Sequence, residues 1–471
     1  MMTATTTPLT LPLLARMTEG DLVVREVPRD PSAREALLRR TVHGARIDSR
    51  AIQPDELFVP LRGAHADGHD FLAAAFERGA GAALCDREHY PRWAGHEPGP
   101  LVLVDDVTAA LQRLAQRYRE QWSGLLLGLT GSVGKTTTKE LVAAALETAA
   151  PTLRTEGNLN NHWGVALTLL RLEPEHQTAV VEMAMNAAGE IAALARIARP
   201  TAALITGAGR AHLGGAGLGT PEAVAAEKAS LALHVPDGAP VFANADSPAL
   251  MAALRPLGRR LVTYGLGPDA EVRPSAVESL GVDGSRFEVA GFPPLRMRLV
   301  GRHQVGNALA AIAVAREYRL DPAAVAAALA AVTPLPGRME VHSVGGATLL
   351  VDCYNANPDS TRAALATLAE CPALRRIAVL GDMLELGAAT AALHREAGAA
   401  TRDAELWTVG AHADDTAAGG RDAGVVARVF PDPTVLVAAL REVLAPGTVV
   451  LFKASRGAAL ERVVAALEGR D

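Results

Sequence analysis

The sequence predicts an α/β fold of three domains: a small N-terminal α/β domain, a central doubly wound sheet and a C-terminal Rossmann-like sheet. The chain has 471 residues, which is too long for one hydrophobic core when a domain holds about 100–200 residues. Short apolar runs alternate with helical segments through most of its length, as expected of parallel sheets covered by helices. Two prolines and a glycine at Thr333–Gly337 separate two such regions, because they cannot extend the preceding helix.

The N-terminal domain is predicted to span residues 1–122. Short apolar runs predict its strands, at Leu57–Leu61, Ala82–Cys85 and Leu101–Val104. A helical stretch is expected at Asp70–Arg78. Apolar residues recur at helical spacing in Val107–Trp122, so this segment is predicted to be a helix leading into the next domain.

The central domain is predicted to span residues 123–332 and to hold a parallel sheet with helices on both faces. Its expected strands are Leu125–Leu129, Ala179–Met183, Ala202–Thr206 and Val241–Ala243. Its expected helices are Thr136–Thr148, Gly164–Leu172, Gly189–Ile197 and Pro221–Leu233. The segment Val272–Val300 alternates differently and is expected to form an antiparallel hairpin.

The C-terminal domain is predicted to span residues 333–471. Four apolar runs separated by helical segments predict its strands, at Leu349–Asp352, Ile377–Leu380, Leu406–Val409 and Val449–Phe452. This pattern predicts a second doubly wound sheet with its own core.

Composition excludes several classes of protein. A net charge of −6 argues against a nucleic-acid-binding face, which needs clustered positive charge. Three distant cysteines fit reduced thiols and argue against a metal-binding knuckle. The apolar run Leu9–Leu14 is too short for a signal peptide, and no uncharged run approaches the ~18 residues of a membrane span. We therefore expect a cytoplasmic protein, and we expect a monomer.

The segment between Leu125 and Lys139 carries the strongest functional signal. An apolar run breaks into Gly131-Ser132-Val133-Gly134-Lys135-Thr136-Thr137 at the start of a predicted helix. Such a turn directs backbone N–H groups at one point, where the helix N-terminus adds partial positive charge and Lys135 a full one. A nucleotide triphosphate fits there, with Thr136 placed to bind its Mg²⁺. The central sheet is therefore predicted to be P-loop ATPase-like, although Leu129 stands where the usual motif has its first glycine. The alternative is an ordinary glycine-rich turn.

Two titratable residues are expected at the carboxyl edge of the central sheet, and a third lies on a later helix. Glu182 ends a predicted strand, so its carboxylate would face the phosphate loop and offer Mg²⁺ a hard oxygen ligand. His212 follows the next strand, and the alternative is a packed or solvated histidine. Lys228 lies among alanines on a predicted helix; it either extends to solvent or is desolvated, which favours an amine able to react covalently.

Polar clusters follow other predicted strands. Their members are Asn158, Asn160 and Asn161; Tyr354, Asn355 and Asn357; and Lys453, Ser455 and Arg456. Amides in such numbers suit hydrogen bonds to a polar ligand, and cations beside a helix N-terminus suit phosphate or carboxylate. Strand-end turns and solvated surface charges are the alternatives.

Taken together, these segments resemble the Mur ligases, the ATP-dependent amide-bond-forming enzymes of peptidoglycan synthesis. The resemblance runs from about Asp48 to Val464 and includes the shortened first half of the phosphate loop. The matching segments, in the family's order, are Asp48–Arg50, Leu57–Val59, Asp67–Phe71, Thr130–Lys139, Gly157–Gly164, Glu182-Met183, Ala211–Leu213, Lys228, Gly301–Asn307, Pro336–Arg338, Tyr354–Pro358, Gly381–Gly387 and Lys453–Arg456. Tyr354–Pro358 and Gly381–Gly387 favour the member that adds D-alanyl-D-alanine to UDP-N-acetylmuramoyl-tripeptide.

The resemblance implies ATP and Mg²⁺ as cofactors, and this tripeptide and D-alanyl-D-alanine as substrates. It implies that Lys135, His212 and Lys228 are catalytic, and that the metal ligands are Thr136, Glu182, His212 and Lys228, the last carbamylated by CO₂. The implied nucleotide-binding residues are Gly131, Ser132, Val133, Gly134, Lys135, Thr136, Thr137, His303, Asn307, Arg338 and Asp352. The implied substrate-binding residues are Ser49, Arg50, Asn158, Asn160, Asn161, Tyr354, Asn355, Asn357, Lys453, Ser455 and Arg456.

The implied reaction passes the γ-phosphoryl of ATP to the terminal carboxylate of the tripeptide, and the amine of D-alanyl-D-alanine then attacks the acyl phosphate. The chain departs from the family pattern near the second metal and the adenine, at Ala184, Gly214, Ser230 and Gln304. Two other hypotheses stay open. One is a sibling ligase that adds a third amino acid or a polyglutamate tail; the other is a nucleotide-dependent binding module without ligation.

Overall fold

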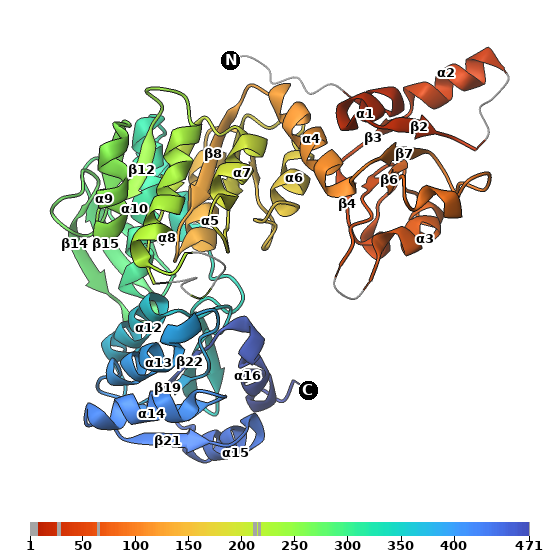
Figure 1. Cartoon of the computed structure of the whole chain (residues 1–471). Coiled ribbons are helices and arrows are strands. Elements are labelled where there is room, and N and C mark those ends of the chain that lie inside the picture. The colour runs from red at the N-terminus through yellow and green to blue at the C-terminus, as the bar shows by residue number, and fades with distance from the viewer. Residues whose placement is uncertain (1–7, 26–29, 64–65, 211–213, 215–217, 471) are drawn as a thin grey trace.

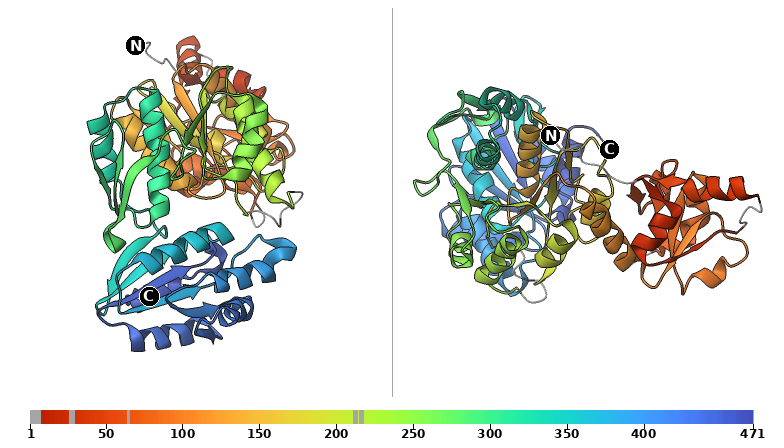
Figure 2. Two further views of the ribbon diagram at one scale, coloured as in Figure 1. Left: turned by 90° about the vertical axis from the view of Figure 1, so that its left-hand side faces the viewer. Right: turned by 90° about the horizontal axis from the view of Figure 1, so that it is seen from above.

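The computed structural model describes residues 8–25, 30–63, 66–210, 214 and 218–470. Its main sheets follow one another along the chain, each with its own helices (Figure 1). The N-terminal part stands to the side of the other two, and the C-terminal part lies below the central one (Figures 1 and 2). The predicted α/β class with three successive units is confirmed. Within the described ranges, the structure contains no helix of the length and apolar character needed to span a membrane.

The central sheet is parallel, with strand order β13-β12-β11-β8-β10-β9. Its strands are β8 (Leu125–Thr130), β9 (Thr152–Arg154), β10 (Thr178–Glu182), β11 (Ala202–Ile205), β12 (Val241–Asn244) and β13 (Leu261–Tyr264). Its helices are α5 (Lys135–Glu147), α6 (Gly164–Leu169), α7 (Glu190–Ala198), α8 (Pro221–Ala229), α9 (Pro248–Leu254), α10 (Arg302–Glu317) and α11 (Pro322–Ala331). The four predicted strands are confirmed, and the edge strands β9 and β13 were not predicted.

The chain order reverses across β8. Strands β9 and β10 lie on one side of it, and β11 to β13 lie on the other. At such a switch point the loops after neighbouring strands diverge and leave a crevice at the carboxyl ends of the strands. The loop after β8, which carries the predicted phosphate site, opens into this crevice.

A small antiparallel sheet joins the central unit after β13. It consists of β14 (Pro274–Ser279), β15 (Ser285–Val289) and β16 (Leu295–Met297). The antiparallel hairpin expected within Val272–Val300 is therefore confirmed, with a third strand added.

The C-terminal sheet has the order β17-β18-β22-β19-β20-β21, in which only β17 runs antiparallel to its neighbour. Its strands are β17 (Glu340–Val344), β18 (Ala347–Asp352), β19 (Arg375–Leu380), β20 (Glu405–Val409), β21 (Ala427–Phe430) and β22 (Thr448–Lys453). Its helices are α12 (Pro358–Glu370), α13 (Thr390–Ala399), α14 (Ala413–Asp422), α15 (Pro433–Val443) and α16 (Glu461–Leu467). The four predicted strands are confirmed. β17 was missed, although Gly345-Gly346, both with positive φ, is a hairpin signal.

The N-terminal sheet has the order β2-β7-β6-β5-β4. Its strands are β2 (Asp21–Val23), β4 (Ala45–Arg46), β5 (Leu57–Phe58), β6 (Ala82–Asp86) and β7 (Leu101–Val104), and β1 (Leu9–Thr10) pairs with β3 (Thr41–Val42) beside it. Its α-helices are α1 (Leu11–Thr18), α2 (Pro31–Arg39) and α3 (Leu72–Glu77). The predicted strand at Leu57–Leu61 is shorter than expected, and the predicted helix at Asp70–Arg78 begins as the 3₁₀ turn Gly68–Phe71.

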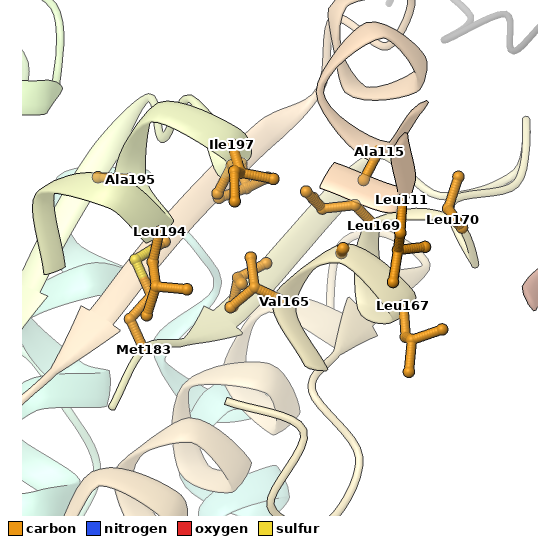
Figure 3. Close-up of a cluster of buried hydrophobic side chains, with 14 of the residues drawn as sticks. Leu111, Ala115, Val165, Leu167, Leu169, Leu170, Met183, Leu194, Ala195 and Ile197 are labelled. Atoms are coloured by element: carbon orange, nitrogen blue, oxygen red, sulfur yellow. The ribbon is translucent and has the colours of Figure 1, made fainter. Parts of the chain in front are cut away.

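Helix α4 (Val107–Glu120) ties the N-terminal part to the central one. It contacts α1 on one side and α6 and α7 on the other. Leu111 and Ala115 of α4 lie beside Leu169 of α6 and the following Leu170 in one buried cluster (Figure 3). Because this cluster runs across residue 122, the domain boundary there stays a prediction, as does the one at residue 332.

We expect Leu111→Ala to lower the free energy of unfolding by about 2–5 kcal/mol, because it deletes buried methyl groups and leaves a cavity. Leu111 is fully buried, whereas Leu374 is 92% exposed. Urea unfolding followed by circular dichroism measures both variants. The control Leu374→Ala should change stability by less than about 0.5 kcal/mol, and equal effects of the two would contradict the described packing of α4.

Candidate functional site

The crevice at β8 meets the C-terminal sheet across a cavity of about 220 Å³. Its walls are the loop after β8, the end of β10, the start of α10 and the ends of β18 and β22. The predicted site residues that line it are Ser132, Val133, Gly134, Lys135, Thr136, Thr137, Asn160, Glu182, His303, Asn307, Arg338, Asp352, Tyr354, Asn355, Asn357 and Lys453. The fold therefore brings together most of the residues that the sequence singled out in the central and C-terminal units.

Two glycines allow the loop after β8 to take its shape. A Cβ on Gly131 would lie 1.9 Å from Thr206 Oγ1, and that hydroxyl donates to the carbonyl of Val133 at 2.6 Å. Gly134 has φ +80°, and a Cβ there would lie 2.5 Å from Asn307 Oδ1. The turn leads directly into α5, whose first N–H groups lack intrahelical acceptors. These groups and the helix dipole make the loop a site for an anion.

Lys135 lies against this loop. Its Nζ donates to the carbonyl of Gly131 at 2.7 Å. Burial lowers the pKa of its ammonium, an effect that the charge of Glu182 opposes and that of Arg338 adds to. A cation that is costly to keep charged gains most from a phosphate placed beside it.

Glu182, at the end of β10, is 1% exposed. Its Oε1 accepts a hydrogen bond from Asn160 Nδ2 at 2.8 Å and a longer one from Thr136 Oγ1 at 3.4 Å. Its Oε2 is buried and has no hydrogen-bond partner among the described residues. A buried carboxylate oxygen is costly without a partner, and a hydroxyl beside a carboxylate is a donor set that suits Mg²⁺. The residues present therefore fit a divalent cation.

Lys228, on α8, is fully buried. Burial, and then the charge of Lys135, lower its pKa well below the usual range of a lysine, while Glu227 opposes the shift. These surroundings oppose the charged form of the amine, which is the direction that the desolvated alternative expected. His212, the other predicted residue of this group, lies outside the described residues.

Arg338 follows the linker that precedes β17, and its side chain contacts Thr136 beside the phosphate loop. Its Nη2 donates to Thr136 Oγ1 at 2.9 Å, and its guanidinium lies 4.1 Å from the ring centre of Tyr354. Arg456 lies near the same ring, 5.4 Å from its centre. Residues of the C-terminal unit therefore hold Arg338 where it reaches the loop of the central unit.

Helix α10 supplies another wall. Asn307 Oδ1 accepts from Thr138 Oγ1 at 3.1 Å, and its Nδ2 donates to Gln304 Oε1 at 2.7 Å. Gln304, one of the departures from the family pattern, therefore fixes the orientation of the Asn307 amide. Burial lowers the pKa of His303 on the same helix, and Asp352 opposes that shift.

The ammonium of Lys453 binds partners within the C-terminal unit. Its Nζ lies 2.7 Å from Asp352 Oδ2 and donates to the carbonyl of Asn355 at 2.7 Å, and the residue is 3% exposed. The sequence suggested a cation for an incoming anion, whereas Asp352 already neutralises much of its charge. Arg456 is exposed and lies outside the lining of this cavity.

Asn357 and Ser455 have clear structural partners. Asn357 and Ser360 cap α12 reciprocally, at 2.9 and 3.0 Å. Ser455 Oγ accepts from the Leu384 N–H at 3.0 Å and donates to the Ala356 carbonyl at 3.2 Å. Asn357 therefore orders the loop after β18, as the turn alternative expected for its cluster, and Ser455 orders the loop after β22.

Four further predicted residues, Ser49, Arg50, Asn158 and Asn161, do not line this cavity. Asn158 is exposed, and Asn161 Oδ1 accepts from the N–H groups of Trp163 and Gly164 at the start of α6. Ser49 and Arg50 form a 3₁₀ turn in the N-terminal unit, where Arg50 pairs with Asp48 at 2.8 Å. A second cavity of about 790 Å³, between the N-terminal and central units, is lined by residues next to Ser49, Arg50 and Asn158 in the sequence, which are Asp48, Ala51 and Leu159.

Sequence reasoning missed a contact behind the phosphate loop. Ser132 Oγ accepts from the Gly209 N–H at 2.9 Å, and the next residue, Arg210, reaches Asp359 and Glu396 of the C-terminal unit. No local pattern signals a pairing between residues so far apart in the chain.

Comparisons with known proteins agree with this arrangement. Models of the Mur ligase family match as the catalytic domain at residues 41–119, the middle domain at 129–315 and the glutamate ligase domain at 337–456. The UDP-N-acetylmuramoyl-tripeptide--D-alanyl-D-alanine ligase of Synechocystis sp. is 39% identical over 428 residues, which are 89% of this chain and 90% of that protein.

Two solved structures are similar over nearly the whole chain. A crystal structure of MurF from Acinetobacter baumannii has a TM-score of 0.85 and 27% identity, covering 98% of this chain and 99% of that one. The MurF ligase of Thermotoga maritima, in complex with ADP, has a TM-score of 0.78 and 26% identity, covering 91% of this chain and 98% of that one.

We expect Gly134→Ala to weaken ATP binding at least tenfold without unfolding the protein. The positive φ and the close approach of Asn307 together impose backbone strain of about 1–3 kcal/mol on any side chain there. Isothermal titration calorimetry with ATP measures the loss. Gly189→Ala is the control, since Gly189 has a similar φ of +84° but no atom within 4 Å of its Cβ position. Equal affinities of both variants would contradict the role of this approach.

Proposed function

This chain belongs to the Mur ligase family, and we propose that it joins D-alanyl-D-alanine to UDP-N-acetylmuramoyl-tripeptide at the expense of ATP, in peptidoglycan precursor synthesis. The observation that carries this function is the 39% identity, over 89% of the chain, to a ligase of that name. The anion-binding loop at the start of α5 supports this function, because the γ-phosphoryl of ATP must be bound before it is transferred.

The chemistry begins with a poor acyl donor. The terminal carboxylate of the tripeptide resists attack by an amine, and transfer of the γ-phosphoryl of ATP gives it a leaving group. The amine of D-alanyl-D-alanine then attacks the acyl phosphate, so that an amide forms and phosphate leaves. Lys135 and the N–H groups of the loop hold the anionic groups that must approach each other.

We place Mg²⁺ between Thr136 and Glu182, where the unpaired Oε2 supports a cation. A bound Mg²⁺ would offset phosphate charge and make the γ-phosphorus a better electrophile. His212 and a carbamate on Lys228 are proposed as ligands of a second ion. The low pKa of Lys228 supports the carbamate, because CO₂ reacts only with a neutral amine.

The three substrates would bind in different parts of the site. The nucleotide lies in the 220 Å³ cavity and contacts the loop, His303, Asn307, Arg338 and Asp352. The 790 Å³ cavity between the N-terminal and central units suits the UDP-linked tripeptide, next to Ser49, Arg50 and Asn158. Its peptide would pass Asn160 and Asn161. The acceptor dipeptide would meet the acyl phosphate from the C-terminal side, beside Tyr354, Asn355 and Arg456.

Water competes with the acceptor amine in this reaction, because an acyl phosphate hydrolyses in open solvent. Closure of the C-terminal unit on the central one would exclude water, with Thr333–Gly337 as a hinge. The contact of Arg338 with Thr136 supports such a closed arrangement.

The proposed function is tested by phosphate release and by isotope transfer. With UDP-tripeptide, ATP and D-alanyl-D-alanine, ¹⁸O from the tripeptide carboxylate should appear in the released phosphate. Lys135→Ala should reduce turnover at least 10³-fold, since preorganised charge at the transferred phosphoryl is worth several kcal/mol, while the circular dichroism spectrum is unchanged. The control Arg286→Ala alters an exposed cation on β15 and should retain full activity.

The other hypotheses give different results in the same assay. A sibling ligase would release phosphate with a single amino acid or glutamate in place of the dipeptide. A binding module would bind ATP and release no phosphate. Phosphate without ¹⁸O, in the presence of amide product, would contradict the acyl phosphate.

We expect activity to depend on CO₂ through Lys228. Removing CO₂ from the buffer should lower the rate several-fold, and bicarbonate should restore it. Lowering the pH protonates the amine and favours release of CO₂, so the bicarbonate requirement should become stronger towards acid. ¹³C NMR with ¹³CO₂ should show a carbamate signal that Lys228→Ala abolishes. A CO₂-independent rate and no carbamate signal would refute this role.

A further inference from the structure

A network of ion pairs joins the central and C-terminal units beside the phosphate loop. Arg210, in the segment after β11, donates from Nη1 and Nη2 to the two carboxylate oxygens of Glu396 on α13, at 2.6 and 2.8 Å. Its Nη2 lies 3.6 Å from Asp359 Oδ1 on α12. The side chains of Arg210, Asp359 and Glu396 are 27%, 30% and 41% exposed. A bidentate pair in this setting is fixed more firmly than an isolated surface pair.

The backbone of the same segment contacts both units. The N–H of Gly209 donates to Ser132 Oγ in the phosphate loop at 2.9 Å, and the N–H of Arg210 donates to Asp359 Oδ2 at 2.8 Å. A Cβ on Gly209 would lie 2.2 Å from that Asp359 oxygen, so the approach is too close for a side chain. Two successive residues therefore set the position of the phosphate loop relative to α12.

Arg362 can be compared with Arg210, because both arginines contact Glu396 and Asp359. Arg362, on α12, also contacts Glu396, at 2.5 Å, and Asp359, at 3.7 Å. All three of these residues belong to the C-terminal unit, so their contacts do not cross between units. Arg210 brings the same charge to the same carboxylates from the central unit.

We propose that Arg210 is a positioning residue that latches the C-terminal unit onto the phosphate loop, so that the acceptor amine reaches the acyl phosphate before water does. This inference rests on the proposed ligase function. Arg210 does not line the nucleotide cavity, so its contribution lies in the capture of the acyl phosphate and not in binding of ATP. The contacts that hold the two units together here are those of the Arg210 guanidinium with the carboxylates of Glu396 and Asp359.

Arg210→Gln and the control Arg362→Gln test the latch. For Arg210→Gln we expect kcat/KM for D-alanyl-D-alanine to fall roughly tenfold, within the range that coupled ion pairs show, while the Kd of ATP stays within twofold. The ratio of phosphate released to amide formed should rise above that of the parent, because water then competes for the acyl phosphate. Arg362→Gln should leave that ratio unchanged.

A double-mutant cycle completes the test. Glu396→Gln should raise the same ratio as Arg210→Gln, and the double variant should lose less than the sum of the two single losses, because the Arg210–Glu396 pair is lost in all three. Additive losses would overturn the latch. So would equal ratios for Arg210→Gln and Arg362→Gln, a matching loss of ATP affinity, or a lowered melting temperature that accounts for the loss. A parent protein that forms no amide would instead overturn the proposed function itself.

Discussion

One buried carboxylate oxygen, with no hydrogen-bond partner among the described residues and beside a loop whose N–H groups and Lys135 attract an anion, is the constraint on which the site depends. Oε2 of Glu182 accepts no hydrogen bond from the described residues, and Lys135 and Lys228 are lysines whose surroundings oppose their charged forms. Burying such groups is costly unless a partner completes them. Under the proposed function, a phosphate chain with a divalent cation would supply both, since the phosphate would meet the loop and the cation would meet the carboxylate.

No single unit of the chain builds this site. The central sheet provides the loop and Glu182 because its order reverses at β8, which opens a crevice there. The C-terminal unit and its linker bring Arg338 to Thr136 and anchor Arg210. Under the proposed function, the acyl phosphate would depend on these contacts between units for protection from water.

The sequence predicted the parts of the fold that have local causes. Strand β8 and its loop follow from a buried run that breaks into Gly-Lys-Thr, and Glu182 follows from its place at a strand end. Edge strands β9 and β13 are short and half-buried, so they lack a clear period. Asn357 and Ser455 were assigned to ligand binding, a role that stays untested, and their amide and hydroxyl order loops; composition alone does not separate these uses. The Arg210–Glu396 pair spans 186 positions, and only the tertiary fold brings its members together.

The most direct test of this account is a crystal structure with a non-hydrolysable ATP analogue and Mn²⁺, whose anomalous signal locates the cation. The account predicts the triphosphate on the N–H groups of residues 131–137 and an anomalous peak within bonding distance of Thr136 Oγ1 and Glu182. A loop that stays closed on its own side chains, or a nucleotide and cation bound elsewhere, would contradict it.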